Sequence, residues 1–316
     1  MDAEIGSRQS ILCGGKGINM NKKKFDGSIS EIMVAYKPDG SLDFEPIRKM
    51  VDFQVENHID GLFMGGLSTQ TYLLTQQEKK QVCEELMKAA AGRVPVMMNI
   101  MEDSIADAKE LVQAYMDMGV DAVCISQPSV FPYTGQALYE FFDELIPEDY
   151  PTYLYNVPQT GNTMSPSVTA RIANAHPNVL GYKDSTQNIA GLQELMAQVK
   201  NPDFQYIAGS DSMTLPMMAL GGVGVISAIS VPFPKVVLDI TERFFAGDMQ
   251  GALDAHRFSM KVRRLLKTAT DMNGYYYACE LLDMPFHGTR MPKNMTEMTE
   301  DQKRIIRTGL EEMKLI

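Results

Sequence analysis

The sequence predicts an α/β fold, a single (β/α)8 TIM barrel with a C-terminal helical extension. Short apolar runs rich in β-branched residues alternate with longer segments of helical periodicity, which is typical of repeated βα units around a parallel sheet. The pattern recurs about eight times, and the composition does not shift between the two halves of the chain. Both features favour one closed barrel over two doubly wound domains, and 316 residues suffice for its core.

Eight apolar runs are the expected strands, and each is followed by polar residues, glycine or proline. They are Ile29–Ala35, Gly61–Met64, Val94–Asn99, Ala122–Ser126, Thr152–Tyr155, Val179–Lys183, Gln205–Ala208 and Gly224–Ala228. The segments expected as helices between them include Phe44–Glu56, Thr75–Ala91, Ser104–Met118, Gly135–Glu144, Ser165–Ala175 and Ile189–Gln198. Ser165-Pro166 and the pair of Thr75 and Glu78 are capping patterns that mark the starts of two of these helices.

We expect three regions along the chain. Residues 1–26 are polar and glycine-rich, which predicts a poorly ordered leader outside the fold. Residues 27–238 are expected to form the barrel, and residues 239–316 a helical region with helices near Ala252–Leu266, Asn273–Leu282 and Asp301–Lys314.

Charge and composition argue against several classes of protein. The formal net charge of −11 disfavours nucleic acid and anionic membranes as partners, because both require a basic face. No apolar run reaches the length of a membrane helix, and the four cysteines are scattered, so we expect a cytoplasmic protein without disulfides. The four histidines are far apart and no phosphate-binding loop occurs, so neither a metal nor a nucleotide cofactor is expected.

Three polar residues end apolar runs of the predicted barrel: Ser68, Tyr155 and Lys183. The reactive groups of such barrels lie at the C-terminal ends of the strands. A lysine that is desolvated there loses part of its preference for the charged form, and a neutral amine can form a Schiff base with a carbonyl. Tyr155 could then transfer protons, with Ser68 in a relay of hydroxyls. The alternatives are an ion pair of Lys183 with Asp184 and a structural role for Tyr155.

Two motifs carry a resemblance to a known family. Tyr155-Asn156-Val157-Pro158 followed by Gly181-Tyr182-Lys183-Asp184-Ser185 resembles the dihydrodipicolinate synthase and N-acetylneuraminate lyase family of class I aldolases. The likeness extends from Gly27-Ser28-Ile29 through Gly224-Val225-Ile226-Ser227 to Arg290-Met291-Pro292, and so covers nearly the whole chain after the leader.

The resemblance implies roles for individual residues. Lys183 would form the Schiff base and Tyr155 would be the acid and base. The family loop that binds the carboxylate of pyruvate through backbone amides and hydroxyls falls on residues 66–70, with Ser68 and Thr69 as substrate-binding residues. The main-chain carbonyl of Ile226 would face the keto acid. Ser185 and Asp211 match positions that contact the sugar chain in the lyases, although capping of the next helix is an equal alternative.

Several positions depart from the family pattern. Leu67 replaces a hydroxyl of the proton relay, and Ser129-Val130 stands where the synthases have two tyrosines, one of which reaches the neighbouring subunit. The arginine that holds a second carboxylate in the synthases is missing after Pro158. Glu31 is unusual in the first strand, since a carboxylate inside the barrel would need a partner: it is either a functional replacement or points to solvent, and we expect the second.

The resulting functional hypothesis is a Schiff-base carbon–carbon lyase with pyruvate as the enamine component and an aldehyde as its partner. The missing arginine favours a 2-keto-3-deoxy sugar acid or a sialic-acid-like substrate. One alternative is 4-hydroxy-tetrahydrodipicolinate synthase, which joins pyruvate and aspartate semialdehyde. Another is a noncatalytic keto-acid-binding or regulatory protein. The resemblance also implies a homo-oligomer, a dimer or tetramer.

Overall fold

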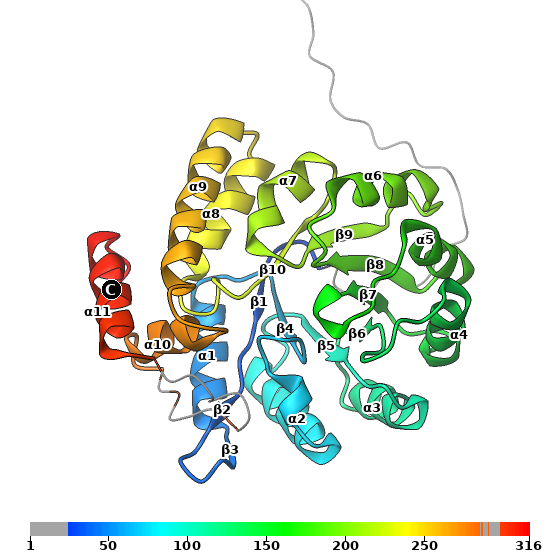
Figure 1. The fold of residues 1–316 in the computed structure, drawn as a ribbon, viewed down its shortest axis with the longest axis horizontal. Coiled ribbons are helices and arrows are strands. Elements are labelled where there is room, and N and C mark those ends of the chain that lie inside the picture. Colours follow the sequence, from blue (N-terminus) through cyan, green and yellow to red (C-terminus); the bar gives the residue numbers. More distant parts are fainter. Residues whose placement is uncertain (1–24, 285, 287–289, 291–297) are drawn as a thin grey trace, which may run out of the picture.

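The computed structural model describes residues 25–284, 286, 290 and 298–316, and these form a barrel with surrounding helices (Figure 1). Eight parallel strands close in the order β1-β10-β9-β8-β7-β6-β5-β4, which confirms the predicted fold class. They are β1 Gly27–Glu31, β4 Gly61–Met64, β5 Val96–Ile100, β6 Ala122–Ser126, β7 Thr152–Asn156, β8 Val179–Asp184, β9 Gln205–Ala208 and β10 Gly224–Ser227.

Helices cover the outside of the barrel (Figure 1). Those that follow the successive strands are α1 Glu45–Glu56, α2 Gln76–Ala90, α3 Ile105–Asp117, α4 Gly135–Leu145, α5 Pro166–Ala175, α6 Ile189–Gln198, α7 Thr214–Ala219 and α8 Pro234–Phe245. Short 3-10 helices lie at η1 Thr71–Leu73, η2 Pro158–Thr160 and η3 Asp211–Met213. The predicted start signals are confirmed: Thr75 and Glu78 form a capping box, and the Ser165 side chain accepts a hydrogen bond from the Val168 N–H.

The first strand is the main difference from the predicted elements. It ends at Glu31, and the chain then leaves the barrel for a small hairpin of β2 Ala35–Tyr36 and β3 Leu42–Asp43. The apolar run Ile32–Val34 is buried, although it is not part of the strand. Glu31 therefore stands at the C-terminal end of β1 and not in its middle, and this end of a barrel carries the chemistry.

The C-terminal region is helical, as predicted. Helices α9 Met249–Leu266, α10 Asn273–Glu280 and α11 Glu300–Glu312 pack against one another at one side of the barrel (Figure 1). The expected boundary at residue 238 falls inside α8, so the barrel extends to the end of that helix. Of the motif Arg290-Met291-Pro292, only Arg290 is described, and its side chain pairs with Glu78.

The interior of the barrel holds a core of its own. Ile29, Phe63, Tyr153 and Ile226 are buried there together with Phe25, which packs edge-on against the Tyr153 ring at 5.7 Å between centroids. The predicted leader of residues 1–26 includes Phe25, which is instead part of this core. Residues 1–24 of the predicted leader lie outside the described residues.

Candidate active site

Lys183 and Tyr155 lie on neighbouring strands. They are direct partners in the register of β8 and β7, so their side chains point to the same side of the sheet. The Lys183 side chain is fully buried, and its Nζ lies 4.1 Å from the centroid of the Tyr155 ring and 3.8 Å from that of Phe63. The two residues predicted to carry the chemistry are thus brought together at the C-terminal ends of their strands.

Glu31 is the ion-pair partner of Lys183. The expectation that Glu31 points to solvent is wrong: it is 5% exposed, and its Oε2 accepts a hydrogen bond from Lys183 Nζ at 3.3 Å. Asp184, the alternative partner, instead accepts a hydrogen bond from the backbone N–H of Thr186. Successive residues of a strand point to opposite faces, which separates Asp184 from Lys183.

The charge of Glu31 also corrects the expected protonation of Lys183. Burial alone would lower the pKa of this lysine, but the Glu31 carboxylate, helped by Tyr155 and Cys124, raises it above its ordinary value. Lys183 is therefore an ammonium group within a buried ion pair, and not a neutral amine. Any use of Lys183 as a nucleophile requires that its proton first moves to a neighbour.

The Tyr155 hydroxyl contacts Ser185, and not Ser68. Tyr155 OH lies 3.4 Å from Ser185 Oγ, which also donates to the Gly209 carbonyl at 3.0 Å. Burial raises the pKa of Tyr155; the charge of Lys183 opposes this shift and that of Glu31 adds to it. The phenol is therefore protonated at neutral pH. Ser185 is buried and faces the cavity, so it does not cap the next helix, which Asn188 caps instead.

The two substrate-binding residues predicted in the loop of residues 66–70 lie in different surroundings. Ser68 lines the cavity, and its backbone N–H donates to Glu31 Oε1 at 3.1 Å. Thr69 is fully buried: its hydroxyl donates to the Ile32 carbonyl at 2.9 Å and accepts from the Gly65 N–H at 3.0 Å. Thr69 thus shapes the loop from behind, and its role in substrate binding stays a prediction.

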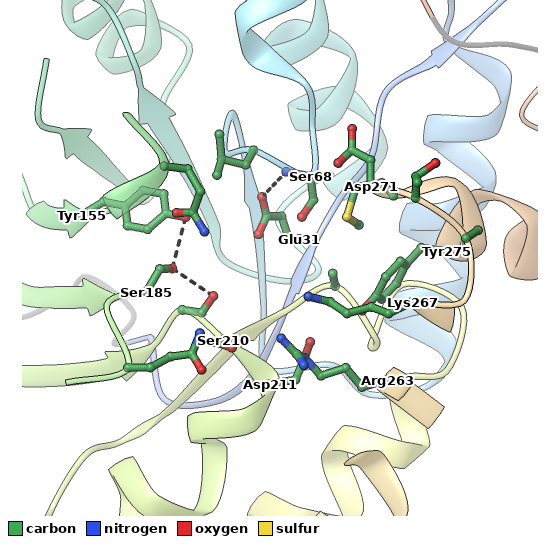
Figure 2. Close-up of a pocket in the computed structure, with 18 residues that line it drawn as sticks. Glu31, Ser68, Tyr155, Ser185, Ser210, Asp211, Arg263, Lys267, Asp271 and Tyr275 are labelled. Atoms are coloured by element: carbon green, nitrogen blue, oxygen red, sulfur yellow. Dashed lines mark hydrogen bonds between the residues drawn. The ribbon is translucent and has the colours of Figure 1, made fainter. Parts of the chain in front are cut away.

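A cavity of about 470 Å³ opens at this end of the barrel (Figure 2). Its lining includes four residues named above, Glu31, Ser68, Tyr155 and Ser185, and also Asp211. Burial raises the pKa of Asp211 to about 6, and Ser227 donates a hydrogen bond to its carboxylate. Ile226, next to Ser227 on β10, is 1% exposed and is not among the residues that line this cavity.

Two cations on the far wall were missed by the sequence analysis. Arg263 and Lys267 come from the end of α9 and line the cavity across from Tyr155 and Ser185 (Figure 2). Four residues apart on a helix, they lie on one face, and this spacing was a signal that the sequence offered. It could not show that α9 packs beside the barrel mouth. Near the missing arginine, Gln159 lines the same cavity.

The described residues show neither a metal-binding cluster nor a membrane-spanning helix. No group of three or more His, Cys, Asp or Glu side chains in residues 25–284, 286, 290 and 298–316 is arranged to hold a metal ion. Within the same ranges, no helix combines the length and apolar character needed to cross a bilayer.

Comparison with known proteins agrees with this geometry. The sequence model of the Dihydrodipicolinate synthetase family matches residues 24–313. The chain belongs to this family. A 4-hydroxy-tetrahydrodipicolinate synthase of Hydrogenobaculum sp. is 30% identical over 292 residues, which cover 92% of this chain and 99% of the relative. One of Geobacter metallireducens is 32% identical over 240 residues, covering 75% of this chain and 82% of the relative.

Solved structures of dihydrodipicolinate synthase family members have the same fold. The crystal structure of the synthase from Aquifex aeolicus has a TM-score of 0.86 at 29% identity, covering 92% of this chain and 99% of that chain. A prophage protein of the family from E. coli K12, crystallised in complex with pyruvate, has a TM-score of 0.86 at 25% identity, with 92% and 99% covered. As a member of this family, the protein is a lyase of the class I aldolase type.

Proposed function

We propose that Lys183 forms a Schiff base with a 2-oxo acid, with pyruvate as the enamine component of a carbon–carbon bond-forming or bond-breaking reaction. The observation that carries the proposal is the adjacency of a fully buried lysine and a buried phenol at the mouth of a closed barrel, 4.1 Å from Nζ to ring centroid. The protonated imine is an electron sink that allows C–C cleavage next to it. The phenol of Tyr155 is in place to exchange a proton with a substrate hydroxyl.

The cations of the cavity support an anionic substrate. The Ser68 amide already holds Glu31, so a substrate carboxylate needs other donors or must displace Glu31. Arg263 and Lys267 provide positive charge on the far wall of the same cavity. A guanidinium can hold a carboxylate by two parallel hydrogen bonds, and an ammonium adds a point charge.

The aldehyde component has two candidates. The hydroxyls of Ser185 and Ser210 and the carboxyl group of Asp211 give the cavity polar walls, which suit the hydroxyls of a 2-keto-3-deoxy sugar acid or a sialic-acid-like substrate. Aspartate semialdehyde is favoured by the names of the relatives, which are 4-hydroxy-tetrahydrodipicolinate synthases. Arg263 and Lys267 also favour this carboxylate-bearing aldehyde, because they supply positive charge to the cavity where the arginine after Pro158 is missing. We expect the protein to act without a metal, and its assembly into a homo-oligomer stays a prediction.

Reductive trapping tests the central step. The protein is incubated with pyruvate and sodium borohydride, and the modified residue is located by peptide mass spectrometry. We expect a pyruvyl adduct on Lys183, which Lys183→Arg abolishes. Lys79→Arg is the matched control, because Lys79 is also buried and paired with an acid, Glu102. Absence of any adduct on Lys183 in the unmodified protein refutes the proposed function.

A substrate panel then separates the candidates. Release of pyruvate from 2-keto-3-deoxy acids supports the lyase, whereas consumption of pyruvate only with aspartate semialdehyde supports the synthase. An adduct on Lys183 without turnover of either substrate class would favour the noncatalytic binder.

A further inference from the structure

Glu31 is held in one orientation by two contacts. Its Oε1 accepts the backbone N–H of Ser68 at 3.1 Å, and this directs Oε2 to Lys183 Nζ at 3.3 Å. Glu31 also lines the cavity (Figure 2), whereas Lys183 is fully buried and is not among the lining residues, so a bound carbonyl compound meets the Glu31 side of the ion pair. A carboxylate that only neutralised the lysine would not need to face the cavity.

Gly66 makes room for this carboxylate. A Cβ atom at position 66 would lie 2.4 Å from Glu31 Oε1 and 2.9 Å from Phe63 Cε1, closer than any real contact. The absence of a side chain at residue 66 and the presence of an acid at residue 31 are therefore linked. The loop that follows β4 is shaped around Glu31 from two sides, by the space at Gly66 and by the amide of Ser68.

Among the described residues, the hydroxyl chain from Tyr155 gives a proton no route away from the cavity. It runs from Tyr155 to Ser185 and ends on the Gly209 carbonyl, which can accept a hydrogen bond but cannot pass a proton on. Leu67, which also lines the cavity, has no hydroxyl with which to extend a relay in the other direction. Among the described groups that contact Lys183, the Tyr155 phenol is already protonated, whereas the Glu31 carboxylate can both accept a proton from the ammonium and return it.

We propose that Glu31 is the general base and general acid of Schiff-base formation at Lys183, in place of a tyrosine-centred relay. The inference rests on the proposed function of Lys183. In the first step a proton moves from Lys183 Nζ to Glu31 Oε2, which leaves a neutral amine beside a carboxylic acid. The amine attacks the substrate carbonyl, the C–N bond forms, and the carbonyl oxygen takes a proton from the nitrogen to give a carbinolamine.

Glu31 then returns its proton. The carboxylic acid protonates the carbinolamine hydroxyl, the C–O bond breaks, and water leaves as the nitrogen lone pair forms the C=N bond. The products are a protonated imine on Lys183, one water molecule and the Glu31 carboxylate. The carboxylate again faces a positive nitrogen, so the ion pair is restored at the end of the step.

Glu31→Gln separates this role from that of a counter-ion, because the two predict opposite changes in rate. Without the carboxylate, the desolvated Lys183 favours its neutral form, and an amine that is already neutral attacks a carbonyl faster. A counter-ion role therefore predicts imine formation at an unchanged or higher rate. The proposed role predicts a rate lower by about 10²-fold, because the carbinolamine loses its proton donor.

The rate is measured by quenching mixtures of protein and pyruvate with borohydride at successive times and counting the Lys183 adduct by mass spectrometry. Glu102→Gln is the matched control, since Glu102 is also a partly buried acid paired with a lysine, and it should leave the rate unchanged. Tyr155→Phe should slow turnover of the full substrate but not formation of the pyruvate imine.

Chemical rescue provides a second test that does not depend on the stability of Glu31→Gln. Glu31→Ala leaves a space that formate can occupy, and we expect added formate, but not chloride, to restore part of the rate. An adduct that forms at the normal rate in Glu31→Gln, or the lack of any rescue, refutes the role of Glu31 and leaves the proposed function intact. No adduct in the unmodified protein refutes both.

Discussion

Removing the charge of Lys183 tests how strongly the buried ion pair contributes to stability. The two side chains are 0% and 6% exposed, and their charged atoms lie 3.3 Å apart. Lys183→Met preserves most of the side-chain length but leaves the Glu31 carboxylate buried without a counter-ion. Breaking a buried pair in this way costs about 3–5 kcal/mol, because the remaining charge stays desolvated.

This cost corresponds to a measurable change in melting temperature. An unfolding entropy of about 2.1 cal/mol/K per residue gives ~0.6 kcal/mol/K for the roughly 280 residues that the structure describes. Dividing the cost by this entropy, we expect the Tm of Lys183→Met to fall by about 5–8 °C. Differential scanning calorimetry at one scan rate provides the comparison with the unmodified protein.

The double variant Lys183→Met with Glu31→Gln shows whether the loss comes from the unpaired charge. The amide keeps an oxygen that can accept the Ser68 N–H but carries no charge. Replacing both members of a buried pair is often close to neutral, so the double variant should recover more than half of the lost Tm. If it melts at or below the single variant, the loss reflects packing around Lys183, and the argument from charge is refuted.

Three further predictions concern the walls of the cavity. Burial raises the pKa of Asp211 from 3.8 to about 6, so its protonated form stabilises the fold fully below pH 3.8, and this contribution of about 3 kcal/mol is lost as the pH rises from 3.8 to about 6. Asp211→Asn should flatten the pH dependence of urea unfolding between these two pH values. Gly66→Ala should displace the Glu31 carboxylate and slow formation of the pyruvate imine, while circular dichroism shows an intact fold. A normal rate would contradict the tight fit of Glu31 against residue 66. Alanine at Arg263 or Lys267 should raise the KM for carboxylate-bearing aldehydes about tenfold without changing the yield of the pyruvate adduct. Steady-state kinetics with an uncharged aldehyde is the control, because its KM should not change.

The positions of the strands were largely predictable, because a buried parallel strand is a short apolar run between turn residues. Strands β4, β6 and β9 have the predicted bounds. The first strand is shorter than predicted, since the apolar run continues into Ile32–Val34, which is buried outside the barrel sheet. An apolar run predicts that its residues are buried, but it does not show whether they belong to a strand of the sheet or are buried next to it.

The sequence by itself determined which side chains end the strands. Lys183 and Tyr155 follow from the order and spacing of their motifs, and the barrel brings them together because neighbouring parallel strands end on the same side. Their protonation could not be predicted, since it depends on what lies within a few ångströms of the amine.

Only the tertiary structure decided the electrostatics of the site. Glu31 is 152 positions from Lys183 in the sequence, and the closure of the barrel places its carboxylate against the amine. Arg263 reaches the same cavity from α9. Charge acts through space over a few ångströms, whereas a sequence pattern records only neighbours along the chain, so the acid that raises the pKa of Lys183 became apparent only once the strands were assembled.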